Sequence, residues 1–304
     1  MLGIGLALAM SVCTTVLLTG CSDSDPSEEG GKEVVNRNAN TAVGDRAVLR
    51  LEFPALTKTG RQQVIVHRLP DGAYDKDSVN FCTEWDCDRK SQRWSCYQLH
   101  KGFTGSYSRV TSSYPQDPAI AKADRYTDLI YGSGFEHGHI CPNADRGFSH
   151  DANYQTFYMS NMQPQYHEFN GFDSKNSSRK GLWLRMEQRL NSWAKSLSDK
   201  DTIFVCKGGT IDDEDNIIKR IDNKLIVPRF FFMAILRKSQ FGYTAMGFWS
   251  EQTSDYRTDE TLLSHAMSID ELERRTGIDF FCNLPDDIED TVERTFNAAS
   301  WNGL

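Results

Sequence analysis

Hydrophobic residues with a two-residue period predict β-strands along much of the chain. Residues 63–69 (QVIVHRL) show this alternation, and residues 78–86 and 93–99 are rich in aromatic and β-branched side chains. A short polar segment separates the latter two runs, which is typical of a β-hairpin. Three later apolar runs predict further strands, over residues 202–210, 230–236 and 243–249.

Hydrophobic residues recur at three- and four-residue steps in residues 181–197, which predicts an amphipathic helix. A second helix is predicted over residues 268–277, where Ser268 suits the N-cap, a glutamate follows three residues later and a glycine ends the segment. Residues 123–131 are a candidate for a short helix. Because strands and helices do not alternate regularly, the predicted fold class is α+β with a mainly antiparallel sheet.

The composition is that of an ordinary globular protein. Charged residues make up 25% and hydrophobic residues 39% of the 304 residues, enough for one large domain or two small ones. No internal repeat is visible. After the N-terminus, no run approaches the roughly 20 apolar residues that a membrane span needs.

The N-terminus has a different character. Residues 1–21 contain no charged side chain and end in Leu18-Thr19-Gly20-Cys21. They contain the apolar region and small residues of a signal peptide but lack its positive n-region. This ending resembles the lipobox of bacterial lipoproteins, which implies cleavage before Cys21 and diacylation of its thiol. A plain N-terminal membrane anchor is the alternative.

Residues 21–46 are predicted to be a flexible acidic tether, because they contain almost no large apolar side chains. Five acids and one base lie within residues 22–33, whereas the whole chain has a net charge of −8. The predicted globular domain, residues 47–304, is therefore only mildly acidic. A nucleic acid would have to be held by a local site or a metal rather than by a broad positive surface.

Cysteine usage agrees with export. Six cysteines remain after the leader, and an even number in an exported domain favours disulfides, with free thiols as the other possibility. Their positions are Cys82, Cys87, Cys96, Cys141, Cys206 and Cys282. The spacing Cys82-x4-Cys87-x8-Cys96-x3-His100 also permits a zinc site, although no second cysteine pair follows.

Residues 134–146 (GFEHGHICPNADR) concentrate polar groups that suit a metal site, a proton-transfer site or an ordinary polar strand. His137 and His139 are two residues apart, so on a strand they share one face. A neutral imidazole can take a proton from water near pH 7. Magnesium prefers oxygen ligands, so an asparagine carbonyl with several waters is a sufficient site, and a nearby glutamate can hold one of those waters.

The region resembles the DNA/RNA non-specific endonucleases of the ββα-metal (His-Me finger) class. The elements of the family motif occur in order, as Glu136-His137-Gly138-His139, Pro142, Tyr158-Met159-Ser160-Asn161-Met162-Gln163-Pro164-Gln165, Asn170, Trp183 and Glu187. An upstream arginine, Arg109, also matches in a loop ending at Pro118.

The resemblance implies a ββα-metal catalytic motif with flanking helices and a role for each matched residue. His139 is the expected general base, Asn170 the direct metal ligand, and Arg109 the phosphate contact. Glu187 is expected to position a metal-bound water. Glu136 replaces the family's aspartate and is expected to orient the motif.

Two departures from the family pattern matter. His137 stands in place of the family's arginine, so one phosphate contact is weakened or is made by Arg146. Asn170 and Glu187 are 17 positions apart, with an apparent insertion between them, whereas about two helical turns separate the pair in the family. Asn176, within the insertion, is a competing metal ligand, but Asn170 is favoured because it follows the motif directly.

The remaining polar residues have ordinary interpretations. Asn161 is expected to be structural. The acidic run 212–215 is interpreted as a solvated turn rather than a Ca²⁺ loop. The other histidines are expected to lie at the surface or to form hydrogen bonds: His67, His100, His150, His167 and His265.

The sequence thus predicts an exported, lipid-anchored endonuclease that hydrolyses DNA and RNA with Mg²⁺, Mn²⁺ or another divalent cation. Cys21 would provide the membrane attachment, and no protein partner is predicted. Two alternatives remain open. The Glu-His-Gly-His variant and the weak basic charge favour a phosphodiesterase or phosphatase of the same fold acting on small nucleotides. The insertion after Asn170 favours a catalytically inactive surface binding module.

Overall fold

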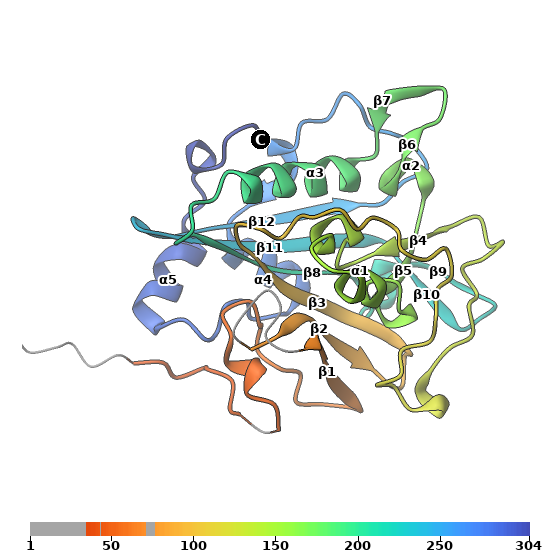
Figure 1. Ribbon diagram of the computed structural model, residues 1–304, viewed down its shortest axis with the longest axis horizontal. Helices are drawn as coiled ribbons and strands as arrows, with labels where there is room; N and C mark the ends of the chain where they lie inside the picture. The colour runs from red at the N-terminus through yellow and green to blue at the C-terminus, as the bar shows by residue number, and fades with distance from the viewer. Residues whose placement is uncertain (1–34, 43, 71–76) are drawn as a thin grey trace, which may run out of the picture. The chain divides into compact units, whose positions relative to one another are not determined.

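A seven-stranded sheet in the order β1-β2-β3-β8-β11-β12-β13 runs through the computed structural model, and every neighbouring pair is antiparallel (Figure 1). The structure describes residues 35–42, 44–70 and 77–304. The strands of the sheet are β1 Gln62–Arg68, β2 Val79–Asp86, β3 Ser91–Leu99, β8 Thr202–Gly209, β11 Phe230–Ser239, β12 Gly242–Glu251 and β13 Ala266–Met267. This arrangement confirms the predicted α+β class and the predicted antiparallel sheet.

Helices cover both faces of the sheet. One apolar layer joins helix α3 (Leu182–Lys195), through Trp183 and Met186, to inward-facing side chains such as Val205 and Met233. The opposite layer joins α4 (Ile269–Thr276) and α5 (Asp286–Arg294) to alternate residues of the same strands. Because both faces are buried, β8 and the first seven residues of β11 form long apolar runs, which explains why these strands are predictable from the sequence.

Among the described residues, three two-stranded antiparallel sheets and two short α-helices add to this framework. They are β4 Glu136–His139 with β5 Met162–Gln165, β6 Phe172–Asp173 with β7 Asn176–Lys180, β9 Ile217–Ile221 with β10 Leu225–Pro228, α1 His150–Gln155 and α2 His167–Asn170. These elements are short and polar, so their hydrophobic pattern is weak. No helix among the described residues is both long and apolar enough to cross a membrane.

The short helix expected over residues 123–131 is wrong. Only Lys122–Asp124 forms a single 3₁₀ turn, and Arg125 is already extended. The side chain of Asp128 accepts hydrogen bonds from the backbone N–H groups of Ile130 and Tyr131. An aspartate that bonds its own backbone in this way competes with helix formation.

Part of the segment assigned to the tether belongs to the folded domain. The Asn36 amide donates to the carbonyls of Cys282 and Leu284, at 3.2 and 2.6 Å. The Asn40 amide donates to Val48 and Pro54. These contacts join residues 35–46 to the domain, so the folded region begins before residue 47. The leader and the rest of the tether lie outside the described residues.

All six cysteines of the domain are free and buried. Cys82, Cys96 and Cys206 are direct neighbours across β2, β3 and β8. Cys87 lies in a different apolar cluster, beside Trp85. These cysteines therefore do not come together as a zinc site. All six are free thiols rather than members of the disulfides that export favours.

Candidate active site

The antiparallel pair of strands β4 and β5 carries the predicted catalytic segment. Asn161, just before β5, holds the chain that follows β4 in place. The side-chain oxygen of Asn161 accepts from the Cys141 N–H at 2.8 Å, and its amide donates to the carbonyls of Cys141 and Thr156. The asparagine of the Tyr-x-Ser-Asn motif is therefore structural, as expected. It connects the chain after β4 to the start of β5.

Gly138 is required by a side chain of the neighbouring strand. A Cβ atom at this position would lie 2.3 Å from Cδ of Gln165. A glycine lets another group approach the backbone closely. In the structure, the group that approaches is the Gln165 side chain.

His139 is a neutral imidazole with a buried, unused nitrogen. Its ring packs edge-on against Phe157, with centroids 4.9 Å apart. Burial, reinforced by the charge of Arg109, lowers the pKa of His139 to about 3. Its Nε2 atom is buried and has no hydrogen-bond partner within the part of the chain that is described. An imidazole that is unprotonated at neutral pH and has a vacant nitrogen can accept a proton.

Arg109 lies beside His139 in a strained conformation. Its φ is +44°, which is unusual for a residue other than glycine. Its guanidinium is 5.5 Å from the Phe157 ring centroid and 3.4 Å from the Tyr114 hydroxyl. The structure thus brings together two residues that are 30 positions apart in sequence and were both assigned to the site. Strained residues of this kind cluster at functional sites.

His137 has a different environment from His139. Its ring stacks on Tyr114 at 3.7 Å, with an interplanar angle of 4°. Its Nε2 atom lies 2.9 Å from a carboxylate oxygen of Asp128. Both polar and aromatic contacts therefore hold His137 in place, and it is not equivalent to its neighbour.

Arg146 cannot take over the phosphate contact that His137 lacks. Its side chain is completely buried. It donates to the carbonyls of Asn80 and Asp145, at 3.1 and 2.7 Å, and packs over Tyr97. That alternative is wrong, because the guanidinium supports the core instead of reaching the solvent.

Glu136, the first residue of β4, forms contacts with two residues of α2. One oxygen of its carboxylate pairs with Nδ1 of His167, and the other accepts from the Asn170 amide at 3.3 Å. The hydrogen bond to Glu136 raises the pKa of His167. His167 was expected to be an ordinary histidine. Its position two residues after the Pro-Gln pair was the only available signal, because its partner Glu136 lies 31 residues away.

The insertion between Asn170 and Glu187 is the β6–β7 hairpin. The Gly181 N–H donates to the Gly171 carbonyl at 2.8 Å, so the chain leaves and returns at one point. Hairpin residues 172–180 account for most of the additional separation between Asn170 and Glu187. Beneath the hairpin, α2 packs on α3, with the rings of Phe169 and Trp183 5.7 Å apart.

Asn176, the competing candidate for the metal, has different surroundings from Asn170. It lies in the exposed hairpin, and its side-chain oxygen accepts from the backbone N–H and hydroxyl of Ser178. Asn170, in contrast, lies at the end of α2 with its amide directed to Glu136. The structure therefore supports the choice of Asn170 over Asn176.

Glu187 forms an ion pair with a buried lysine that the sequence did not single out. Nζ of Lys207 lies 2.6 Å from Oε1 of Glu187 and 4.6 Å from the ring centroid of Trp183. Burial raises the pKa of Glu187, and the charge of Lys207 opposes this effect. Lys207 also contributes to the low pKa of His139, so its charge acts on both groups. A lone lysine within the apolar run 202–210 was the signal for it.

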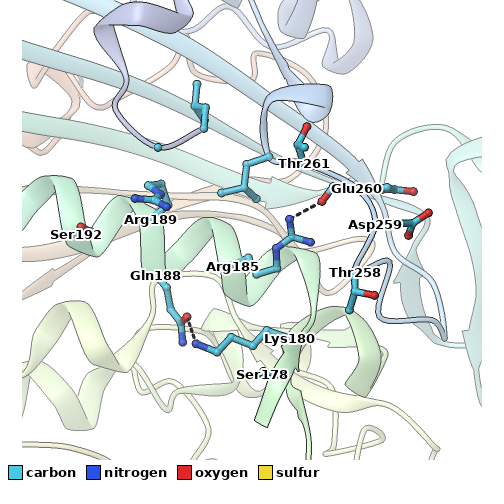
Figure 2. A pocket seen from close by; sticks show the side chains of 13 residues that line it. Ser178, Lys180, Arg185, Gln188, Arg189, Ser192, Thr258, Asp259, Glu260 and Thr261 are labelled. Atoms are coloured by element: carbon cyan, nitrogen blue, oxygen red, sulfur yellow. Dashed lines mark hydrogen bonds between the residues drawn. The ribbon is translucent and has the colours of Figure 1, made fainter. Parts of the chain in front are cut away.

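Two hollows lie along α3. The first, of about 630 Å³, includes Glu187 together with Tyr107 and Asp145. The second, of about 790 Å³, contains the basic side chains Lys180, Arg185 and Arg189 (Figure 2). Both include Gln188 and Ser192, so the hollows adjoin. The larger one includes none of the predicted catalytic side chains, whereas the smaller one contacts Glu187.

The remaining polar groups form local contacts. His67 pairs with Asp117 at 2.8 Å in the interior, and His265 pairs with Glu260 at 2.7 Å. In the acidic run, Asp212 is bound by Arg93 and Glu214 by Arg220. These pairings agree with the ordinary interpretations of the histidines and of the acidic turn.

The fold and the hairpin with its adjoining helices define a protein of the ββα-metal nuclease class. More specifically, the chain belongs to the DNA/RNA non-specific endonuclease family, whose model matches residues 67–287. It is 28% identical over 229 residues to mitochondrial nuclease EXOG of Xenopus laevis, covering 71% of this chain and 60% of that protein.

Other relatives agree. A nuclease of Nostoc sp. is 24% identical, with 70% of this chain and 75% of that protein covered. Bovine mitochondrial endonuclease G is 25% identical, covering 74% and 75%. The crystal structure of an EndoG/EndoGI complex superposes with a TM-score of 0.60 at 20% identity, over 80% of this chain and 94% of that chain. That likeness establishes the fold.

Proposed function

We propose that this protein is a metal-dependent endonuclease that hydrolyses phosphodiester bonds in both DNA and RNA. The observation that carries the proposal is that His139 and Arg109 lie close together, both against Phe157. A neutral imidazole, whose Nε2 atom has no hydrogen-bond partner among the described residues, lies beside an exposed guanidinium. The imidazole can accept a proton from the attacking water, while the guanidinium stabilises the charge that develops on the phosphate oxygens.

The other side chains position these two and the cation. Glu136 orients Asn170 through their hydrogen bond, and His167 holds Glu136 from the other side. Lys207 forms its ion pair with one carboxylate oxygen of Glu187, and the other oxygen takes no part in that pair. Because Glu187 borders a hollow, this second oxygen can hold a water molecule next to the phosphate.

A hard divalent cation fits the oxygen donors at Asn170. The amide nitrogen of Asn170 is directed to Glu136, which leaves its carbonyl oxygen for another partner. The Glu136 side chain is 41% exposed, so water molecules have access to it. Oxygen donors of this kind favour Mg²⁺, with Mn²⁺ or another divalent cation as the alternative. When bound, the cation neutralises charge on the scissile phosphate.

The function is tested with the full chain on supercoiled plasmid, ribosomal RNA and a bis-nucleoside phosphate, each with Mg²⁺ and with EDTA. We expect both polymers to be cut internally with Mg²⁺ and neither to be cut with EDTA. Hydrolysis of the small diester alone would identify a nucleotide phosphodiesterase. Binding of the polymers without cleavage would identify an inactive binding module.

The metal assignment predicts a specific defect for Asn170→Ala. Loss of the ligand should raise the half-saturating Mg²⁺ concentration by about 10–100-fold, the scale seen when a group supporting a metal is removed. The measurement is a Mg²⁺ titration of plasmid nicking. Asn176→Ala is the matched control, because that asparagine lies in the exposed hairpin. Equal defects in the two variants would contradict the assignment.

We further propose that the protein is exported and anchored to a membrane through lipid on Cys21, at the periplasmic face or the cell surface. The apolar leader ending in Leu-Thr-Gly-Cys and the acidic segment after it support this proposal. Cys21→Ala should block lipidation and processing, as measured by labelled palmitate incorporation and membrane fractionation. If that variant is processed and fractionates like the wild type, the anchor is not a lipid on Cys21.

A further inference from the structure

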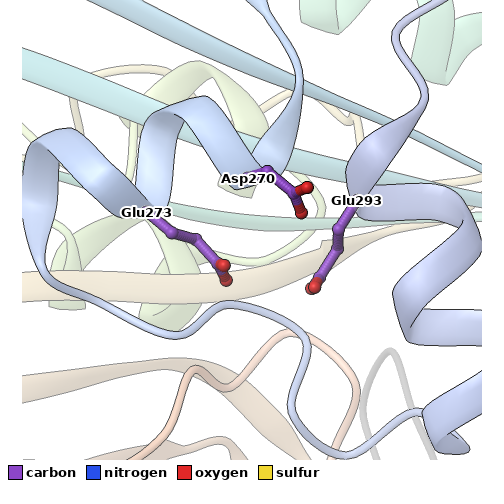
Figure 3. Close-up of side chains that lie close together, drawn as sticks. All are labelled: Asp270, Glu273 and Glu293. Atoms are coloured by element: carbon purple, nitrogen blue, oxygen red, sulfur yellow. The ribbon is translucent and has the colours of Figure 1, made fainter.

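Three carboxylates converge between α4 and α5, on the opposite side of the sheet from α3. Asp270 and Glu273 belong to α4, and Glu293 belongs to α5 (Figure 3). One oxygen of each lies within 4.8 Å of the others. The catalytic segment includes none of these residues, so the group is independent of the proposed nuclease site.

Glu293 is the member that most needs a partner. It is only 6% exposed, and its buried Oε1 atom has no hydrogen-bond partner in the described structure. Burial, with the nearby charges of Glu273 and Glu289, raises the pKa of Glu293 to about 10. A buried carboxylate without a counter-charge is costly, so the arrangement calls for a positive charge or a proton.

The basic side chains of α4 do not supply this charge. Arg274 and Arg275 both pair with Glu271. Glu273 instead accepts a hydrogen bond from the backbone N–H of Phe280 at 2.7 Å, through one of its two oxygens. The other oxygen remains outside that bond. The three carboxylates therefore have oxygen atoms to share with a single ligand.

We propose that Asp270, Glu273 and Glu293 bind one Ca²⁺ ion that joins α4 to α5. The donors are all oxygens, as a hard cation requires. Ca²⁺ takes oxygen ligands at about 2.3–2.6 Å, so donors on opposite sides of the ion are roughly 5 Å apart. Because the three oxygens all lie within 4.8 Å of one another, they are close enough to share one ion of this size.

Magnesium fits less well. Its ligands lie at about 2.0–2.1 Å in a near-ideal octahedron, and it keeps several waters and is usually held by one or two carboxylates rather than by three. Asp270 and Glu273 are partly exposed, so water can complete the larger and more flexible coordination shell of Ca²⁺. Each of the two helices is short, and a shared ion would add a strong connection between them.

The test is the melting temperature of the full chain after removal of metal, measured by calorimetry with and without added CaCl₂. A concentration about 100-fold above the dissociation constant should raise the melting temperature by about 5 °C. Glu293→Gln and Asp270→Asn should lose most of this shift. Without metal, Glu293→Gln should be at least as stable as the wild type, because a neutral amide of similar shape replaces a carboxyl group whose charged form burial disfavours.

Two controls make the result specific. Glu271→Gln removes a carboxylate from the same helix, outside the group, and should retain the full shift. Asn170→Ala should also retain it, which separates this ion from the catalytic cation. The proposal is overturned if Ca²⁺ leaves the wild-type melting temperature unchanged, or if Glu293→Gln and Asp270→Asn shift as much as the wild type. In Asn170→Ala, which lacks the proposed catalytic metal ligand, an equal shift with the same concentration of MgCl₂ would overturn the assignment to Ca²⁺.

Discussion

Replacing His139 by alanine should lower the turnover of plasmid cleavage by about 10²–10⁴-fold, the usual contribution of a general base. The imidazole is kept neutral by burial and has a nitrogen free to receive a proton. Alanine removes this acceptor and leaves the Asn170–Glu136 contact in place. The measurement is turnover at saturating Mg²⁺, and the half-saturating Mg²⁺ concentration should change little.

The neighbouring histidine provides the matched control. His137→Ala should cost far less activity, because His137 is held by Tyr114 and Asp128. His137→Arg should be tolerated and should strengthen nucleic acid binding. If His137→Ala abolishes metal binding as completely as Asn170→Ala, the two histidines form a metal site. A bis-imidazole site suits a transition metal better than Mg²⁺, and the general-base role of His139 would then be refuted.

The pH profile gives a second readout for His139. Its folded pKa lies below the ordinary value, so the ring stays neutral as the pH falls through 6.5 and is protonated only near pH 3. The value of kcat/KM, which reports the free enzyme, should therefore show no loss from this group between pH 8 and pH 5. If kcat/KM of the wild type instead falls with a midpoint near the ordinary histidine pKa of about 6.5, His139 titrates normally.

Arg109→Ala should lower turnover by about 10²–10³-fold, the scale of losing one donor that stabilises transition-state charge. The exposed guanidinium lies beside the base and is held over Phe157. Arg109→Lys should restore only part of the loss, because a planar fork matches two phosphate oxygens and an ammonium does not. The comparison is made on plasmid and on RNA at saturating metal.

Arg125 is the control for this prediction. Its side chain donates to the Ile120 carbonyl at 2.7 Å, and it borders a different hollow. Arg125→Ala should therefore retain near-normal activity. If instead Arg109→Ala is active and Arg125→Ala is not, the phosphate contact belongs to Arg125, since Arg146 is buried and already bonded.

The sequence by itself determined the parts of the protein that depend on local patterns. Every strand of the central sheet except the two-residue β13 was predicted correctly, as were helices α3 and α4, because burial imposes either a regular spacing or an unbroken run of apolar residues. Ser268 caps α4 and Gly277 ends it in the left-handed conformation, as the residue types required. The motif from Glu136 to Glu187 was found in the same way, since its residues occur in a distinctive order.

Only the tertiary structure decided which polar groups meet. Lys207 reaches Glu187 from β8, and His167 reaches Glu136 across 31 positions. Closure of the β6–β7 hairpin at Gly171 and Gly181 leaves Asn176 in an exposed hairpin, whereas Asn170 contacts Glu136.

Burial also separated residues that look alike in sequence. Arg146 is buried in the core, whereas Arg109 is exposed. Burial lowers the pKa of His139, whereas a contact with Asp128 holds His137 in place. The physical reason is that hydrogen bonds, ion pairs and desolvation depend on distances in space. A short polar segment carries no periodic signal that specifies those distances.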